Sequence, residues 1–474
     1  MIARRKVLFG LLLVAAAATP ARAQYAEDTP GLGLRLGPVD MSLHGYFRAP
    51  FRFSWRNRGE GLRDGELLYN IHSPWLVDDD YFRSGFAYTR IQEQDWSELF
   101  FSVGNKHLTG TIGLMGSLFS DWAKPLLDKQ LGIAQGFLTF RWEWEGPKWK
   151  FKLQMKGGSF WDRFGWLEAY DTYIFGRTHQ LGAQIRGDLE YGKLKATLLY
   201  GFGAHLEAIE VNQGLTLLNY FNLSASWDGL LGAGFYVLDG ATQDRRQLKE
   251  IADADMNVAG ADAWVRHPLV GRIYIAGSRI NASQSEYLGP AIEVMHSYGG
   301  RGLQENFLGT ERSEHGTGAL SNFAFEWGWS LKEMMTKYAP EKTGFLAKAR
   351  DLQLRLFGLY TKVESKQADP DPAVNRDNRG YFKWGIEPTV RAFSWLSVSL
   401  RYDRVILNLA DNESAFRVLS PKIAFHVNWW VQGQIFFIYS HYWYGERVLL
   451  RPGQVALETL PDGDVFKVQA QLVF

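Results

Sequence analysis

Apolar and polar residues alternate over long stretches of this chain, and the pattern is clearest towards its two ends. Between Met41 and Arg56 every second residue is apolar or glycine, and the residues between them include three arginines. The last ten residues repeat the pattern, with an apolar face formed by Phe466, Val468, Ala470, Leu472 and Phe474. Such two-faced strands are typical of a transmembrane barrel, in which one face meets lipid and the other meets water.

The same alternation predicts about eighteen strands, with about sixteen as the fallback. We expect them at 41–56, 96–105, 106–115, 134–145, 148–157, 180–191, 193–203, 217–227, 230–238, 255–266, 269–280, 319–330, 351–363, 380–391, 395–405, 416–428, 429–442 and 464–474. Tight turns alternate with long connections between these strands. The sequence therefore predicts an all-β fold, a transmembrane antiparallel β-barrel over residues 24–474 with short periplasmic turns and long extracellular loops.

Three features of the sequence do not fit the prediction of a barrel. The stretch 217–227 has apolar residues on both faces, and Pro388 and Pro421 each remove a ladder hydrogen bond from a predicted strand. The alternative is a periplasmic β-sandwich or propeller. That alternative would not require so many aliphatic and aromatic residues on the outward face.

The first 23 residues predict a secretory signal peptide. Residues 4–6 are basic, residues 7–18 are apolar, and an A-x-A cleavage site precedes Gln24. An apolar run of about twelve residues is shorter than the roughly twenty that a membrane-spanning helix needs. We therefore expect export of the chain and a final location in the bacterial outer membrane.

Composition excludes some kinds of site. The 474 residues contain no cysteine, which excludes disulfides and thiolate metal sites, and the formal net charge of +1 is uninformative. Aromatic residues make up 15% of the chain. Trp142, Trp144 and Trp149 flank a predicted tight turn, where tryptophan is typical of the aromatic girdle at the lipid boundary.

Residues 331–350 break the alternation between short and long connections. They fall at a periplasmic position, yet they are long and helix-like, because Leu331, Met334, Met335 and Tyr338 share one helical face. We expect a small helix on the barrel floor. The alternative is a helix that docks a periplasmic partner or lies on the inner leaflet.

The strand phases also identify which charged residues face the lumen. The basic candidates for a pore lining are Arg48, Arg52, Arg56, Arg141, Lys150, Lys152, Arg186, Arg355, Arg391 and Arg401. The acidic residues at inward positions are fewer, namely Glu143, Asp188, Glu190, Asp262, Glu387 and Asp403. A lumen of one sign favours solutes of the opposite sign. The alternative, that these cations are cross-linked to carboxylates, carries equal weight.

A long outer loop predicted at 158–179 opens with a mixture of aromatic and charged residues. If this loop folds inward, Trp161, Phe164 and Trp166 could stack on sugar rings while Asp162 and Arg163 reach hydroxyl groups. We include Trp161, Arg163 and Trp166 among the pore candidates. The alternative is a loop that packs on itself at the barrel mouth.

Two short motifs carry a family resemblance. The terminal Phe474 resembles the closing strand of bacterial outer-membrane β-barrels, which implies recognition by the barrel-assembly machinery. Val39-Asp40 followed by His44-Gly45-Tyr46 resembles the opening of maltoporin-type carbohydrate channels. The basic lumen is similar to that of alginate-export barrels. These resemblances imply a carbohydrate-selective porin or an exopolysaccharide-export barrel.

No enzyme motif is recognisable, because the chain has no P-loop, zinc-ligand spacing or G-x-S-x-G. We expect no catalytic residue, cofactor or metal, and no nucleic-acid partner. The predicted function is a channel for hydrophilic solutes, carbohydrate or anionic. The alternative is a conduit that secretes an exopolysaccharide with periplasmic partners. The other expected partners are outer-membrane lipid and, in a homotrimer, further copies of the chain.

Overall fold

The structure is a computed structural model of the 474-residue chain. It describes residues 32–55, 96–117, 131–170, 172–205, 216–242, 254–283, 292–293, 317–345, 350–365, 380–406, 409, 415–428, 432–444, 446–451, 454–459 and 462–473. The predicted signal peptide, Arg56 and Phe474 lie outside these residues. Among them no helix is long and apolar enough to cross a membrane.

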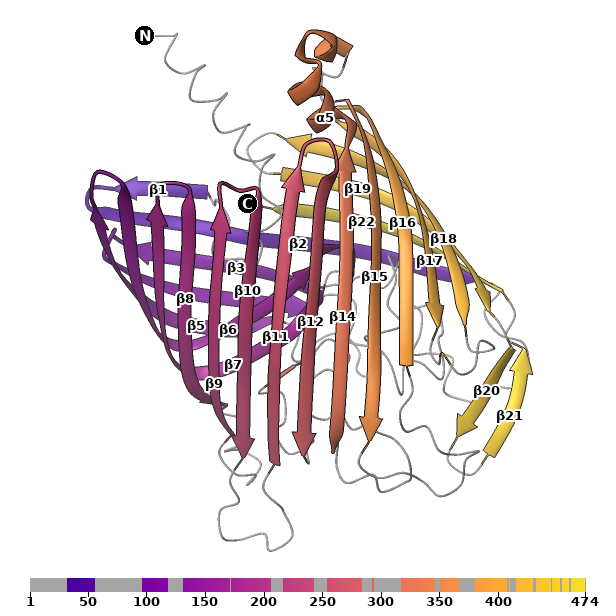
Figure 1. Cartoon of the computed structure of the whole chain (residues 1–474), viewed down its shortest axis with the longest axis horizontal. Coiled ribbons are helices and arrows are strands. Elements are labelled where there is room, and N and C mark those ends of the chain that lie inside the picture. Colours follow the sequence, from indigo (N-terminus) through magenta and orange to yellow (C-terminus); the bar gives the residue numbers. More distant parts are fainter. Residues whose placement is uncertain are drawn as a thin grey trace, which may run out of the picture.

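Eighteen antiparallel strands close into a barrel, as the sequence predicted (Figure 1). They are β2 (Val39–Trp55), β3 (Trp96–Gly104), β4 (Leu108–Ser117), β5 (Leu131–Glu145), β6 (Trp149–Leu167), β7 (Thr172–Tyr191), β8 (Leu194–His205), β9 (Thr216–Trp227), β10 (Leu231–Thr242), β11 (Ala254–His267), β12 (Gly271–Ser283), β14 (Gly318–Ser330), β15 (Asp351–Ser365), β16 (Gly380–Phe393), β17 (Leu396–Ile406), β18 (Phe416–Asn428), β19 (Gln432–Tyr444) and β22 (Gly463–Val473). Each strand pairs with its neighbours in the chain, and β2 pairs with β22 to close the ring.

Four shorter strands were not predicted. β1 (Leu32–Leu36) pairs with β2, and β13 (Ile292–Glu293) pairs with β7. β20 (Glu446–Arg451) and β21 (Gln454–Thr459) pair only with each other as a separate two-stranded sheet. These strands leave the ring of eighteen unchanged.

The outer face of the barrel is apolar. Exposed outward residues alternate with inward ones, for example Leu217 and Leu223 on β9 and Phe235 on β10. Trp142 and Trp144 are 38% and 45% exposed beside the turn at 146–148, as expected for a lipid-boundary girdle. The fold is that of an outer-membrane β-barrel.

In the described part of the chain, one rim of the barrel carries short turns and one longer insertion, residues 331–350. Turns at 105–107, 146–148, 192–193, 228–230, 268–270 and 394–395 join consecutive strands there, and we call this edge the short-turn rim. In outer-membrane barrels the short turns are periplasmic. Pro388 and Pro421, which each lack a backbone N–H, lie where the hydrogen-bond ladder to one neighbouring strand is interrupted. The pairing of β16 with β17 skips Pro388, and the pairing of β18 with β19 skips Pro421.

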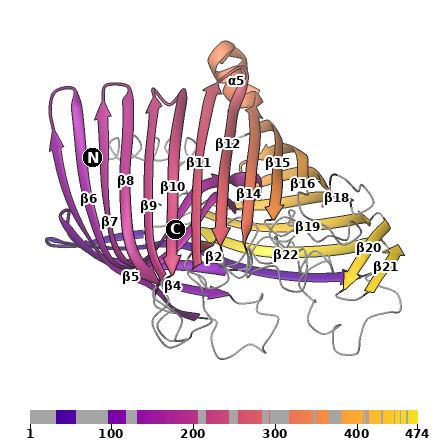
Figure 2. The same ribbon diagram turned by 60° about the horizontal axis from the view of Figure 1, so that its bottom comes forward.

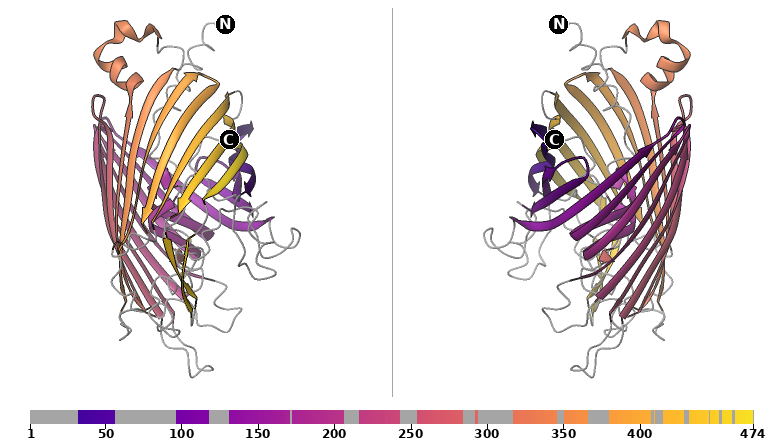
Figure 3. Two further views of the ribbon diagram at one scale, coloured as in Figure 1. Left: turned by 90° about the vertical axis from the view of Figure 1, so that its right-hand side faces the viewer. Right: turned by 90° about the vertical axis from the view of Figure 1, so that its left-hand side faces the viewer.

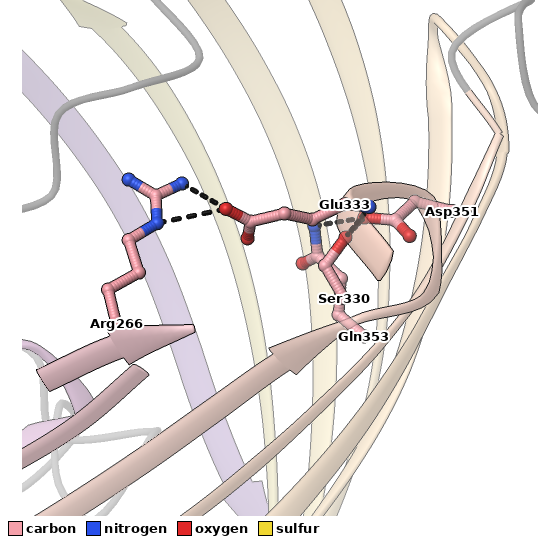
Figure 4. A network of polar contacts seen from close by, with 5 residues as sticks. All are labelled: Arg266, Ser330, Glu333, Asp351 and Gln353. Carbon is pink, nitrogen blue, oxygen red and sulfur yellow. Dashed lines mark hydrogen bonds and ion pairs between the residues drawn. The ribbon is translucent and has the colours of Figure 1, made fainter. Parts of the chain in front are cut away.

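The insertion forms a helix that projects beyond the short-turn rim (Figure 3). α5 (Leu331–Tyr338) is followed by a 3-10 segment, η6 (Pro340–Phe345). The small helix predicted in this connection is therefore present. Ser330 caps α5 by accepting a hydrogen bond from the Glu333 amide, while Arg266 on β11 forms an ion pair with the Glu333 carboxylate at 2.5 Å. Asp351 accepts hydrogen bonds from Ser330 and the Lys332 amide, which ties the helix start to β15 (Figure 4).

The prediction of a long outer loop at 158–179 is wrong. β6 pairs with β5 only as far as Ser159, and β7 pairs with β8 only from Leu181, but β6 and β7 stay paired with each other beyond those points. Residues 160–180 thus form a hairpin that leaves the wall and runs across the inside of the barrel (Figure 2). A short 3-10 turn, η4 (Glu168–Tyr170), forms its tip. We call residues 160–180 the lumen hairpin.

The inner wall is polar on only part of its height. Towards the end opposite the short-turn rim, inward positions are apolar and almost fully buried, including Leu218, Leu238, Met256, Ile280 and Leu359. The predicted cation-rich lumen therefore does not extend to these positions, which are apolar and buried. The same fact explains why 217–227 mixed its faces: Leu218 and Tyr220 face inward, while Leu217 and Leu223 face lipid.

Candidate functional site: the lumen hairpin and the inner wall

The lumen hairpin starts where glycines allow β6 to turn away from the wall. Gly158 has φ of 136°, and a Cβ there would lie 2.4 Å from the carbonyl oxygen of Gly136 on β5. Only glycine tolerates that backbone shape and that close approach. On β7, a Cβ on Gly182 would lie 2.1 Å from the carbonyl oxygen of Phe202. The two strands therefore separate from their outer neighbours at glycines.

Aromatic packing holds the middle of the hairpin against β9 and β10. The Phe164 ring lies 5.3 Å from that of Tyr220, and the Phe175 ring is stacked on Tyr236 at 4.4 Å. Tyr220 also donates a hydrogen bond to the Asp162 carboxylate, which is fully buried. Since Phe164 is itself fully buried, it offers no face to a sugar, and that part of the stacking hypothesis is wrong.

The hairpin tip is tied to four strands of the facing wall. The Ala169 amide donates to Glu326 on β14 at 2.8 Å, and the Ala169 carbonyl accepts from Arg401 on β17 at 2.7 Å. Arg355 on β15 forms an ion pair with Glu168 at 2.5 Å. The Lys383 ammonium on β16 lies 3.9 Å from the centre of the Tyr170 ring. The lumen hairpin therefore narrows the bore by spanning it.

The aromatic residue of the tip, Tyr170, is neutral. Desolvation raises the pKa of Tyr170 well above its ordinary value, and the nearby Asp403 carboxylate raises it further. The neutral ring of Tyr170 packs edge-on against Phe357 at 5.2 Å. The phenol thus acts as an apolar and cation-binding surface.

Apart from Arg52 and Arg56, whose side chains lie outside the described part of the structure, the predicted basic residues lie on the inner face, and many of them are paired. Arg163 forms an ion pair with Glu98 on β3, Arg401 with Asp403 at 2.7 Å, and Arg186 with Asp188 at 3.1 Å. Lys150 lies 3.4 Å from Glu143. For these residues, cross-linking to carboxylates describes the wall correctly.

The remaining candidates are distributed as follows. Arg141 donates to Thr109 at 2.7 Å, Arg391 donates to the Ser394 carbonyl at 3.1 Å, and Arg48 lies over the Tyr46 ring. Lys152 lines a cavity described below. The Arg177 guanidinium lies 4.8 Å from the centre of the Trp161 ring, and the His179 ring lies 4.5 Å from it. Backbone register alone is described for Arg52, opposite Lys467, and for Trp166, opposite Tyr173.

Several inward cations lie over aromatic rings. Lys422 and Lys467 both approach the Phe436 ring, at 4.2 and 5.8 Å from its centre. Lys156 lies 4.8 Å from the centre of the Phe137 ring. An aromatic face stabilises a cation through its quadrupole without cancelling the charge, unlike a carboxylate. The ring contacts themselves therefore do not neutralise these cations.

A cavity of about 600 Å³ lies between the lumen hairpin and the short-turn rim. Gly165 and Glu168 of the hairpin border it, and the inner faces of β5–β12 and β14 form its walls. Its charges are mixed: Lys195 pairs with Glu190 at 2.8 Å, and Asp262 accepts hydrogen bonds from the Tyr236 and Tyr274 hydroxyls. The short-turn side of the lumen is thus close to charge-balanced.

The sequence pattern did not identify three inward acidic groups. Glu98, Glu168 and Glu326 face the interior, and none was among the predicted inward carboxylates. Asp162 was predicted to reach the lumen if its loop folds inward. Glu98 and Glu326 lie in predicted strands at inward positions, so the period-two pattern could have found them. Glu168 could not be found, because its partner Arg355 is 187 residues away in the chain. In the described part of the chain, no cluster of three or more His, Cys, Asp or Glu residues could hold a metal ion.

The chain was compared with protein families, curated proteins and solved structures. No family model and no curated protein matches the chain. Among solved structures, the anion-selective porin from Comamonas acidovorans is 10% identical, with a TM-score of 0.41 over 92% of this chain and 100% of that chain. OmpT, an outer membrane protein of Vibrio cholerae, is 11% identical, with a TM-score of 0.39 over 93% and 99%. Pseudomonas aeruginosa OprD is 9% identical, with a TM-score of 0.39 over 92% and 94%. The likeness concerns the barrel fold alone, and it does not support the narrower resemblances to maltoporin-type or alginate-export barrels.

Proposed function

We propose that the protein is an outer-membrane channel for small hydrophilic solutes with a preference for anions. The observation that carries this proposal is the set of inward cations that face aromatic rings. Lys422, Lys467 and Arg48 lie on β18, β22 and β2, which are consecutive in the wall apart from β19. A positive field in a low-dielectric bore raises the local concentration of anions and their rate of passage.

Register strengthens the argument for this wall. Lys422 is aligned with Ile438, Ile438 with Lys467, and Lys467 with the backbone of Arg52, so one row crosses four strands. Arg48, four residues before Arg52 on β2, is aligned with Gln471. Side chains in one row are neighbours across the sheet. The row thus brings Lys422 and Lys467 to the same level of the inner wall, and β18 is the neighbour of β17, which binds the hairpin tip.

The test is the ion selectivity of the channel in planar bilayers. Replacing Arg48 and Arg52 together by Ser is expected to shift the zero-current potential in a salt gradient towards cation selectivity, while the barrel still folds. The matched control replaces Arg404 and Arg417, which are aligned on β17 and β18 and face outward, by Ser. Unchanged selectivity in the first variant, or no open-channel current from the native protein, would contradict the proposal.

Narrower predictions concern the solute and the direction of flow. Carbohydrate uptake predicts that added sugars block the open-channel current, and polysaccharide export predicts that deleting the gene reduces the secreted polymer. The described residues supply no contact that favours export, so the uptake channel is the function that we propose. A homotrimer remains a prediction for size measurements in mild detergent.

A further inference from the structure

A cluster of charged residues lies on the outward face of the barrel, away from the lumen. Arg279 on β12, Ser321 on β14 and Lys362 on β15 occupy one register row across three neighbouring strands (Figure 1). They share the face of Ile275 and Phe323, which are 42% and 51% exposed. We call Arg279, Ser321, Lys362 and Glu364 the outer cation cluster.

The height of the cluster places it at the edge of the lipid band. Arg279 is eight residues from Gly271, where β12 leaves the short-turn rim. At about 3.3 Å per residue and a tilt near 40°, this distance corresponds to about 20 Å along the barrel axis. The apolar band of such barrels is about 25 Å tall. The long side chains of Arg279 and Lys362 thus reach the level of the outer-leaflet headgroups.

The cluster is preorganised and carries a surplus of positive charge. Glu364 binds Arg279 through one carboxylate oxygen at 2.5 Å and Lys362 through the other at 2.8 Å. Arg279 also donates to Ser321 at 2.6 Å, which fixes the plane of the guanidinium. The side chains of Arg279 and Lys362 remain 42% and 46% exposed. One carboxylate therefore positions two cations, and both cations keep exposed surface towards the membrane boundary.

We propose that the outer cation cluster binds the phosphate group of a phosphorylated glycolipid of the outer leaflet. A guanidinium and an ammonium held side by side match a phosphomonoester, which accepts charge-assisted hydrogen bonds from both. The apolar surface directly below, formed by Ile273, Ile275, Phe325 and Leu356, lies where the acyl chains of the same lipid would run. A soluble phosphate would gain only the polar half of these contacts.

The test compares binding of lipid A that carries its phosphates with binding of dephosphorylated lipid A, by native mass spectrometry of the full chain in detergent. The native protein should bind the phosphorylated lipid about tenfold more tightly, and R279S/K362S should lose that preference. K106S, which removes an exposed cation from a short turn, should retain it. E364Q, which removes the only carboxylate of the cluster, should bind the phosphorylated lipid at least as tightly as the native protein.

Three results would overturn the proposal. The native protein could bind both lipids equally, R279S/K362S could keep the preference, or E364Q could weaken binding as much as the double variant does. Folding of each variant is checked by its heat-modifiable electrophoretic mobility, which differs between folded and unfolded barrels. If the double variant does not fold, the comparison of E364Q with the native protein decides. Channel conductance is a separate readout, because the cluster faces lipid and not the bore.

Discussion

Arg401 offers the sharpest test of whether the lumen hairpin is held across the bore. Its guanidinium donates to both oxygens of Asp403, at 2.8 and 2.7 Å, and to the carbonyl of Ala169 at the hairpin tip. Arg401 and Asp403 are 4% and 1% exposed. We consider two variants: R401M, which removes one member of the buried pair, and R401M/D403M, which removes both.

The two variants separate the stability of the wall from the attachment of the tip. Removing one partner of a buried ion pair leaves an uncompensated charge and costs about 3–5 kcal/mol, whereas replacing both by apolar residues is close to neutral. Both variants lose the bond to Ala169. A hydrogen bond from a charged donor contributes about 1.5–3 kcal/mol, so the detached tip should become about ten- to one-hundredfold more populated.

Denaturant unfolding in micelles measures the first effect, and single-channel recording measures the second. We expect R401M to lower the free energy of unfolding and R401M/D403M to restore most of it, while both give larger or fluctuating conductance. R417M, on the outward face of β18, should change neither quantity. If the double variant conducts as quietly as the native protein, Arg401 does not hold the tip. If R401M is as stable as the native protein, the buried-pair argument is wrong.

Three further predictions use matched pairs or the chain end. G158A should cost about 1–3 kcal/mol of stability, because φ of 136° and the 2.4 Å approach exclude a Cβ, whereas G157A, with open space around it, should stay within about 0.5 kcal/mol. Y220F removes a donor to the buried aspartate of the hairpin and should cost about 1–3 kcal/mol. Y200F, on the outer face, should cost far less, and denaturant midpoints that are equal for the two tyrosine variants would refute this. Deleting Phe474 should lower the assembled yield in the membrane and leave the conductance of assembled channels unchanged.

The positions of the strands could be predicted because lipid imposes one apolar face on every strand of the wall. All eighteen predicted ranges overlap barrel strands, and even 217–227, with its mixed faces, was placed correctly. The lumen hairpin could not be recognised as strand for the same physical reason. Phe160, Asp162 and Phe164 share one face, and Trp161 and Arg163 share the other, yet both faces contact protein. The alternation that lipid enforces therefore disappears there.

The electrostatics of the site were predicted less well than its location. The alternation of apolar and polar residues identified Arg355 and Arg401 as inward residues, but it could not identify their partners at the hairpin tip. Glu168 and Ala169 meet the wall only after the chain has crossed the bore. The inward residues counted from the sequence therefore overestimate the uncompensated positive charge on β15, where Arg355 pairs with Glu168. Register between neighbouring strands is predictable from the pattern, whereas contacts across a lumen depend on a loop conformation that no local pattern encodes.

Inward cations that pair with carboxylates and inward cations that face aromatic rings have different roles. Around the lumen hairpin, Arg163, Arg355 and Arg401 are paired with carboxylates, so they join elements and contribute little net field. On β18 and β22, Lys422 and Lys467 share the Phe436 ring, which stabilises both charges and cancels neither. A ring face carries no net negative charge, so the contact with Phe436 itself neutralises neither ammonium group. Because Lys467 is fully buried, it acts on a passing solute through its electric field and not by direct contact.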